Sequence, residues 1–228
     1  MADAQDDATR LSTITQALTT EHFALQSARG SIATESVGRA TMYLGTVSSA
    51  LIAMGFLAQL LKLDPMFMLI SLVLLATLFM LGVVTCVRLV QLGIDDMSYQ
   101  HAINRLRHWY LEVGPEMRPY FLMSDRDDLD GVLRNLTMTR SGWQLVFSMT
   151  GAISLINSLL GAVAVALAMH TFAGVAVGRG VVGGAVFGAI SAIVHAQVQA
   201  RMWKRAEQRM PVMFPSPASA EASLKNAP

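Results

Sequence analysis

Four long apolar stretches constrain the fold of this chain more than any other feature of its sequence. They cover residues 40–61, 66–87, 144–169 and 180–198, and none contains an aspartate, a glutamate or a lysine. A helix needs about 20 mainly apolar residues to cross the roughly 30 Å hydrocarbon core of a bilayer, where an unpaired charge is costly. With 53% hydrophobic and 14% charged residues, the sequence predicts an all-α fold, an integral membrane four-helix bundle with cytoplasmic helical extensions.

The basic residues predict the orientation of these spans. Of the 17 Lys and Arg residues, all but Lys62 and Arg179 lie before the first span, between the second and third, or after the fourth. Short cytoplasmic loops carry an excess of Lys and Arg. We therefore expect a multi-pass protein of the cell (inner) membrane, with both termini and the long central segment in the cytoplasm.

The polar and apolar regions together divide the chain into five segments. They are an N-terminal cytoplasmic amphipathic helix (1–38), a first transmembrane hairpin (39–90), a cytoplasmic helical segment (91–142), a second transmembrane hairpin (143–199), and a basic, then disordered, C-terminal tail (200–228). The apolar seam from Leu11 to Ile32 fits either a coiled coil or an amphipathic helix docked on its own subunit. From Arg88 onward, the pattern extends the second span as a helix into the cytosol.

The acidic run DRDDLDG (125–131) is placed in the first turn of a short cytoplasmic helix. Ser124 and Asp127 have the spacing of a capping box for that helix, and carboxylates near a helix N-terminus interact favourably with the helix dipole. A calcium loop is excluded, because aligning the acidic residues puts Arg126 at the first ligand position and Thr137 where a glutamate is required.

A glycine pattern in the fourth span matches the G-x-G-x-x-G of dinucleotide-binding proteins, through Gly178, Gly180 and Gly183. That fold requires a strand before the glycines and an acidic residue about 20 positions after them. Only 45 residues follow Gly183, and the nearest acid is Glu207, which lies among basic residues. We interpret the stretch as a membrane helix and expect no cofactor.

Small residues instead recur at every fourth position in three of the spans. The stripes are Gly180, Gly184, Gly188, Ala192 and Ala196 in the fourth span, Thr41, Gly45, Ser49 and Ala53 in the first, and Ser154, Ser158, Ala162 and Ala166 in the third. Such stripes let helix backbones approach closely in lipid. We expect the first, third and fourth spans to pack tightly, while the second, rich in Leu, Met, Phe and Val, exposes much of its surface to lipid or to another subunit.

Few residues suggest chemistry. The sequence shows no pattern typical of a carboxylate pair, a nucleophile with its base, or an HxxxH site, and the single cysteine, Cys86, lies within the second span. We therefore expect a non-enzymatic protein with no catalytic residue, no metal and no nucleic-acid partner.

Three residues are candidates for a pore or gate: Asn157 in the third span, Arg179 in the second outer turn, and His195 near the cytoplasmic end of the fourth span. Arg179 would favour anions at an outer mouth or extend to lipid phosphates. His195 is either a proton-sensitive gate or a neutral packing histidine. The absence of acidic residues from the spans argues against a proton- or sodium-coupled transporter.

At EHFALQ (21–26), GRATMYL (38–44) and INRLRHWY (103–110), the chain resembles a group of uncharacterised four-span membrane proteins of actinobacteria. This resemblance implies the architecture and brings no activity. In architecture alone, the chain is also similar to the two- and four-span effector domains of bacterial defence systems, in which a cytoplasmic helical part triggers membrane disruption. That analogy transfers no residue roles.

Two functional hypotheses follow. In the first, a homo-oligomeric membrane protein in contact with the lipid bilayer uses its cytoplasmic helical module to control the transmembrane bundle, as a channel or as an effector that perturbs the membrane. In the second, the chain is a membrane-anchored scaffold or signalling adaptor that holds a cytosolic protein partner through residues 11–35 and 91–140.

Overall fold

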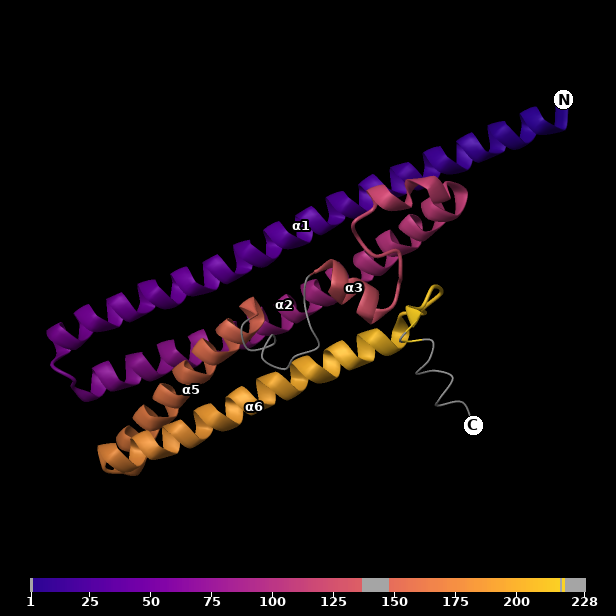
Figure 1. Cartoon of the computed structure of the whole chain (residues 1–228). Coiled ribbons are helices and arrows are strands. Elements are labelled where there is room, and N and C mark those ends of the chain that lie inside the picture. Colours follow the sequence, from indigo (N-terminus) through magenta and orange to yellow (C-terminus); the bar gives the residue numbers. More distant parts are fainter. Residues whose placement is uncertain (1, 137–147, 218, 220–228) are drawn as a thin grey trace, which may run out of the picture. The chain divides into compact units, whose positions relative to one another are not determined.

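The computed structural model describes residues 2–136, 148–217 and 219, and its elements are helices (Figure 1). In chain order they are α1 (Ala2–Leu61), α2 (Pro65–Val113), the 3-10 helix η1 (Pro115–Tyr120), α3 (Leu129–Asn135), α5 (Met149–Ala173) and α6 (Val177–Arg209). Four of them, α1, α2, α5 and α6, are long and apolar enough to cross a membrane by length and composition. The sequence-based prediction of four apolar helices is confirmed at this level.

Two tight turns join the long helices in pairs. Between α1 and α2, Lys62 and Leu63 adopt left-handed backbone conformations with φ of 49° and 59°, and the carboxylate of Asp64 accepts the backbone N–H of Phe67 at 2.8 Å. Between α5 and α6, Gly174 takes φ of 61°, and its N–H bonds to the carbonyl of Met169. Glycine is favoured there because it reaches positive φ without a steric penalty.

The chain divides into two compact units. Unit 1 comprises residues 1–34, 93–140 and 206–228, and unit 2 comprises residues 35–92 and 141–205, within the limits of the described residues. Three helices, α1, α2 and α6, contribute residues to both units without a break in the helix. The extension of α2 through Gly93 to Val113 agrees with the sequence pattern after the second span.

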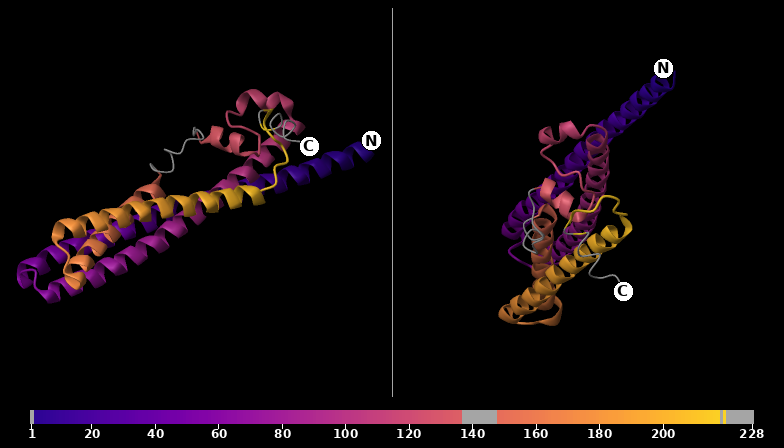
Figure 2. Two further views of the ribbon diagram at one scale, coloured as in Figure 1. Left: turned by 90° about the horizontal axis from the view of Figure 1, so that it is seen from below. Right: turned by 45° about the vertical axis from the view of Figure 1, so that its right-hand side comes forward.

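Within unit 2, α5 and α6 lie side by side as a hairpin in each view of Figure 2. Glycines of α6 make this contact close. A Cβ atom added at Gly188 would lie 3.0 Å from Ala162 Cβ, one at Gly180 would lie 3.1 Å from the Ala166 carbonyl oxygen, and one at Gly184 would overlap the Ala162 carbonyl oxygen. The backbones of α5 and α6 therefore approach along the small residues of both helices.

The second span exposes much of its surface, as expected: Val73 and Met80 of α2 are each 60% exposed. It is nevertheless the more buried of the two helices in the first hairpin. In its most apolar window 28% of α2 is buried, against 6% for α1. The cause is complementary size. The ring of Phe79 packs against Gly161, where an added Cβ would lie 2.8 Å from the ring. The Phe79 ring also faces the ring of Phe187 at a centroid distance of 5.9 Å. Large side chains of α2 fill the space that glycines of the second hairpin leave open.

The small-residue stripe of α1 does not pack within this chain. Gly45 and Ser49 are exposed, and among the described residues nothing lies within 4 Å of a Cβ added at Gly45. α1 uses its opposite face instead, through Ala40, Tyr43 and Val47. The expectation that the α1 stripe packs tightly against the third and fourth spans is therefore wrong for a single chain.

Unit 1 is held by polar contacts between α1 and α2. Arg29 Nε donates to Asp96 Oδ1 at 2.8 Å, and the His22 ring stacks on Tyr110 at 6.2 Å between centroids. Leu18, Leu25 and Ile32 of the apolar seam are partly buried. From Leu18 to Ile32 the seam therefore docks on its own chain, which is the second of the two arrangements that it allowed, whereas Leu11 and Ile14 are exposed.

Candidate functional site

The most distinctive feature of unit 2 is a line of three polar side chains from three different helices. Tyr43 of α1 donates its hydroxyl to Asn157 Oδ1 of α5 at 3.3 Å, and Asn157 Nδ2 lies 3.2 Å from His195 Nε2 of α6. Tyr43 and Asn157 are fully buried. Since an amide nitrogen can only donate, His195 must accept at Nε2, and its imidazole is neutral in this arrangement.

The remaining long helix, α2, reaches this line of polar side chains through a glycine. A Cβ added at Gly82 of α2 would lie 2.8 Å from the Tyr43 hydroxyl and would overlap the Asn157 amide. Gly82 therefore allows the backbone of α2 to pass directly beside the polar groups. Residues of all four long helices meet at this point, which we call the polar junction (Tyr43, Gly82, Asn157 and His195).

Other polar groups of unit 2 are paired between neighbouring helices. Ser158 Oγ donates to Ser191 Oγ at 3.1 Å, and Ser154 Oγ bonds to Cys86 Sγ at 3.4 Å. Both serines of α5 are buried. A polar group in an apolar environment is costly without a partner, so these pairs fix which faces of the helices meet.

An apolar pocket of about 330 Å³ lies beside the polar junction within unit 2. Its surface is almost wholly apolar, and α2, α5 and α6 contribute the lining. The lining residues are Phe79, Val83, Cys86, Val87, Val90, Thr150, Ser154, Phe187, Ile190, Ser191, Val194, His195, Val198, Gln199 and Met202. The pocket therefore lies along the apolar parts of these three helices.

The structure brings together two of the three candidate gate residues. Asn157 and His195 are bonded to each other, whereas Arg179 is exposed in the first turns of α6. Sixteen residues separate Arg179 from His195 along one continuous helix, which at 1.5 Å per residue is about 24 Å. Arg179 is thus remote from the polar junction.

Sequence reasoning missed Tyr43 and Gly82. Tyr43 carries the only hydroxyl-bearing ring in the apolar part of the first span, and buried tyrosine hydroxyls usually find a partner; this signal could have found it. Gly82 lies outside the small-residue stripes, so no periodicity indicated it.

A second site in unit 1 joins the end of the chain to the loop before α3. We call residues 210–217 the C-terminal strap. Asp127, whose side chain is fully buried, accepts the backbone N–H groups of Met213 at 3.0 Å and Phe214 at 2.6 Å. The same carboxylate accepts Arg105 Nε at 2.6 Å, and the Phe214 ring stacks on His108 at 3.9 Å between centroids.

Asp128 holds the strap at a further point. Its Oδ2 accepts both the backbone N–H of Ser216 at 2.9 Å and the Ser216 hydroxyl at 2.6 Å. Its Oδ1 accepts the N–H of Gly131 at 2.9 Å, which makes Asp128 the N-cap of α3. The expected capping box at Ser124 and Asp127 is wrong, because the helix starts later.

The prediction of a disordered tail is wrong for the strap. Residues 200–209 belong to α6. The strap is bound by Asp127 and Asp128, two carboxylates that were expected to interact with a helix dipole. The remainder of the tail that was expected to be disordered, residues 218 and 220–228, lies outside the described residues.

The two carboxylates are charged when they bind the strap. Burial alone would raise the pKa of Asp127, but the N–H groups of Met213 and Phe214 and the Arg105 side chain outweigh it and lower that pKa. Burial acts in the same sense on Asp128, and hydrogen bonds from Ser216, Ser219 and Gly131 lower its pKa to about 2. Hydrogen bonds to the ionised form favour that form.

The described residues include no group of three His, Cys, Asp or Glu side chains arranged to hold a metal ion. Gly178, Gly180 and Gly183 all lie inside α6, and the element before them is the helix α5. A dinucleotide fingerprint needs its glycines between a strand and a helix, so the geometry differs from such a site.

No protein-family model, curated protein or solved structure matches the chain.

Proposed function

We propose that the chain is a non-enzymatic integral membrane protein in which unit 2 spans the cell (inner) membrane and unit 1 lies in the cytoplasm and controls how the spans pack. The four long apolar helices support the membrane placement. The distribution of Lys and Arg supports the orientation, with both termini and residues 93–140 inside. The resemblance to four-span actinobacterial proteins is consistent with this arrangement and adds no activity.

One observation carries the control by unit 1: α1, α2 and α6 each run through both units as unbroken helices. A helix transmits a shift or a rotation along its length because its backbone hydrogen bonds hold successive turns together. The strap follows directly after α6 and is bound by Asp127 and Asp128 of unit 1. A cytosolic signal that alters these contacts would act on α6.

Within the membrane, such a movement of α6 would alter the hydrogen bonds of the polar junction. Its two hydrogen bonds join α1, α5 and α6. An interhelical hydrogen bond in a membrane protein is worth about 0.6 kcal/mol on average. The junction therefore specifies one arrangement of the spans, yet a modest change in unit 1 suffices to replace it. The new arrangement, in an oligomer, opens a conduction path or perturbs the bilayer.

Flux through liposomes tests this function. The purified chain is reconstituted with entrapped ions or dye, with and without cytosolic extract, beside an Asn157→Leu variant that removes both bonds of the junction. Thr77→Val is the matched control, because Thr77 is an exposed residue of α2 that bonds only its own backbone at Val73. We expect flux that Asn157→Leu changes and Thr77→Val does not. No flux of any ion or dye under any condition contradicts the proposal.

A specific observation favours the scaffold as a second function. Near η1, the side chains of Tyr120 and Leu122 are 84% and 97% exposed, although both are large and partly or wholly apolar. Exposed apolar residues that lie together mark surfaces for partners. A cross-linker placed at Leu122 in the full chain would report a cytosolic protein if the scaffold hypothesis holds. Absence of such a protein, together with flux in liposomes, rejects it.

A further inference from the structure

The apolar pocket of unit 2 has the properties of a binding site. Its 330 Å³ form an open groove between one face of α2, the start of α5 and one face of α6. Along α2 the lining runs from Phe79 to Val90, which is about 16 Å at 1.5 Å per residue. Along α6 it runs from Phe187 to Met202, or about 22 Å. The pocket is thus elongated parallel to the helices.

Three polar side chains of the wall, together with the sulfur of Cys86, are paired within the protein. Ser191 is bonded to Ser158, Ser154 to Cys86, and His195 to Asn157. The surface left to an occupant is almost wholly apolar. Water is a poor occupant of such a pocket, because it needs several polar partners to stay there. An apolar occupant therefore fits this surface best.

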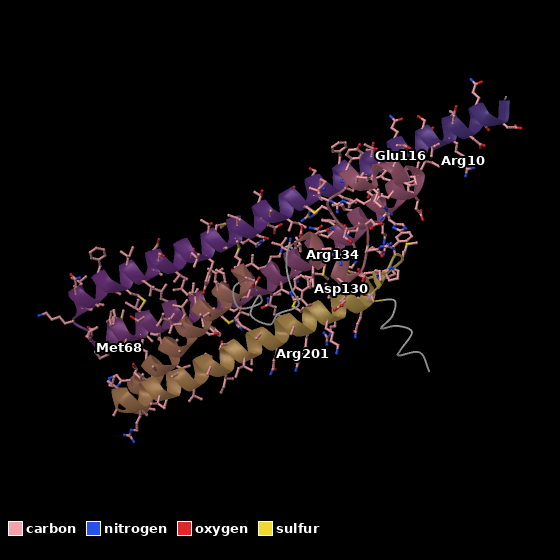
Figure 3. All side chains as sticks on the ribbon, in the orientation of Figure 1. Arg10, Met68, Glu116, Asp130, Arg134 and Arg201 are labelled. Atoms are coloured by element: carbon pink, nitrogen blue, oxygen red, sulfur yellow. The ribbon has the colours of Figure 1, made fainter. Side chains whose placement is uncertain are left out.

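The two ends of the pocket differ in chemistry. One end is formed by the facing rings of Phe79 and Phe187. The other reaches Gln199 and Met202 and is followed on α6 by arginines. Arg201 lies seven residues after Val194, and Arg205 seven after Val198, so both arginines continue the face that lines the pocket. Figure 3 labels Arg201 on α6, and both side chains are exposed.

From these features we infer that the pocket holds one acyl chain of an anionic phospholipid of the cytoplasmic leaflet, with its phosphate beside Arg201 and Arg205. This inference rests on the proposed membrane placement. The chains of one leaflet fill about half of the roughly 30 Å hydrocarbon core, which matches the length of the pocket along α2. An empty pocket would deprive its lining of dispersion contacts, and acyl chains are the fluid that surrounds it in a bilayer.

Photochemical labelling tests the chain-binding part. The full chain is reconstituted in phosphatidylcholine vesicles that contain phosphatidylglycerol with a diazirine on its acyl chain, and adducts are mapped by mass spectrometry. We expect adducts concentrated on Val83–Val90 and Ile190–Val198. Val194→Trp, which fills the pocket, abolishes them. Ile193→Trp is the matched control: Ile193 is the adjacent exposed residue of α6 and does not line the pocket, so its adducts stay unchanged.

A charge series tests the headgroup. Arg201→Gln with Arg205→Gln should remove the preference of the pocket adducts for phosphatidylglycerol over a phosphatidylcholine probe with the same diazirine. Lys204→Gln removes a neighbouring cation that lies on another face of α6 and should leave the preference intact. Equal effects of the two changes overturn the assignment of the phosphate to the arginines.

The failures of the two proposals are distinguishable. If the chain incorporates into vesicles but its adducts spread evenly over exposed positions such as Val84 and Ile193, the pocket inference is wrong and the membrane placement stands. Adducts between two copies of the chain at the pocket also overturn the inference. If the chain does not incorporate and gives no lipid adducts at all, the membrane placement itself is wrong.

Discussion

Replacing Gly184 by alanine isolates the energetic role of close helix contact in unit 2. The added Cβ would overlap the carbonyl oxygen of Ala162 and would lie 3.0 Å from Ala166 Cβ. A backbone carbonyl cannot swing away as a side chain does, so α5 and α6 must separate. Overpacking of this kind costs about 1–3 kcal/mol, and the helix propensity of alanine offsets about 0.5–1 kcal/mol, which leaves a net loss of up to about 2.5 kcal/mol.

Thermal unfolding in detergent measures this loss against two graded controls. At this chain length, each kcal/mol of this loss lowers Tm by about 2–4 °C. Gly183→Ala should be mild, because its Cβ meets only the flexible end of Met169. Gly45→Ala should be neutral or slightly stabilising, since nothing described lies within 4 Å of it. If Gly184→Ala and Gly45→Ala unfold at the same temperature, the close contact does not stabilise the hairpin and the reasoning fails.

Two further predictions concern unit 1 and the orientation. Asp128→Asn keeps an N-cap for α3 but weakens the binding of the strap. In the native chain, the lowering of the Asp128 pKa from 3.8 to about 2 contributes at most about 2 kcal/mol to that binding, part of which solvent screens. That contribution is present above pH 3.8 and is lost as the pH falls through about 2. The protection of the Ser216 amide against hydrogen exchange, relative to the intrinsic exchange rate at each pH, should therefore fall over this range in the native chain; protection that persists to the lowest pH would refute the role of the carboxylate. In a Cys86→Ala background, single cysteines at Thr13 and Glu116 should resist an impermeant thiol reagent in intact cells while one at Asp64 reacts, and the reverse pattern would overturn the orientation.

The four long helices are the part of the fold that the sequence predicts best, because the length and apolar character that a membrane requires are visible in any window of about 20 residues. The stripes of α5 and α6 could be read from their spacing for the same reason. Which face of α1 packs could not, since Gly45 and Tyr43 lie on opposite faces and either could meet a partner. The choice depends on α2, whose Gly82 makes room for Tyr43 and Asn157.

The sequence did not indicate the site in unit 1, because a local explanation was available for its aspartates. Asp127 and Asp128 stand where a helix begins, and helix dipoles favour acids in that position, so the sequence alone supplied a sufficient explanation. Their long-range partners, Met213, Phe214 and Ser216, all donate backbone N–H groups, and Ser216 donates its hydroxyl as well. Every residue except proline carries a backbone donor, and residue identity therefore gives little indication of this contact.

The rate at which Cys86 reacts with a membrane-permeant maleimide tests most directly whether unit 1 controls the packing of unit 2. Cys86 is the only cysteine of the chain, is buried, bonds to Ser154 and lines the pocket, so its reactivity reports on unit 2 alone. A chain ending at Arg209 lacks the strap, and a chain ending at Ser219 keeps it. If unit 1 controls the packing of unit 2, Cys86 reacts several-fold faster in the chain ending at Arg209 than in the full chain, while the chain ending at Ser219 matches the full chain. Equal rates in all three would contradict it.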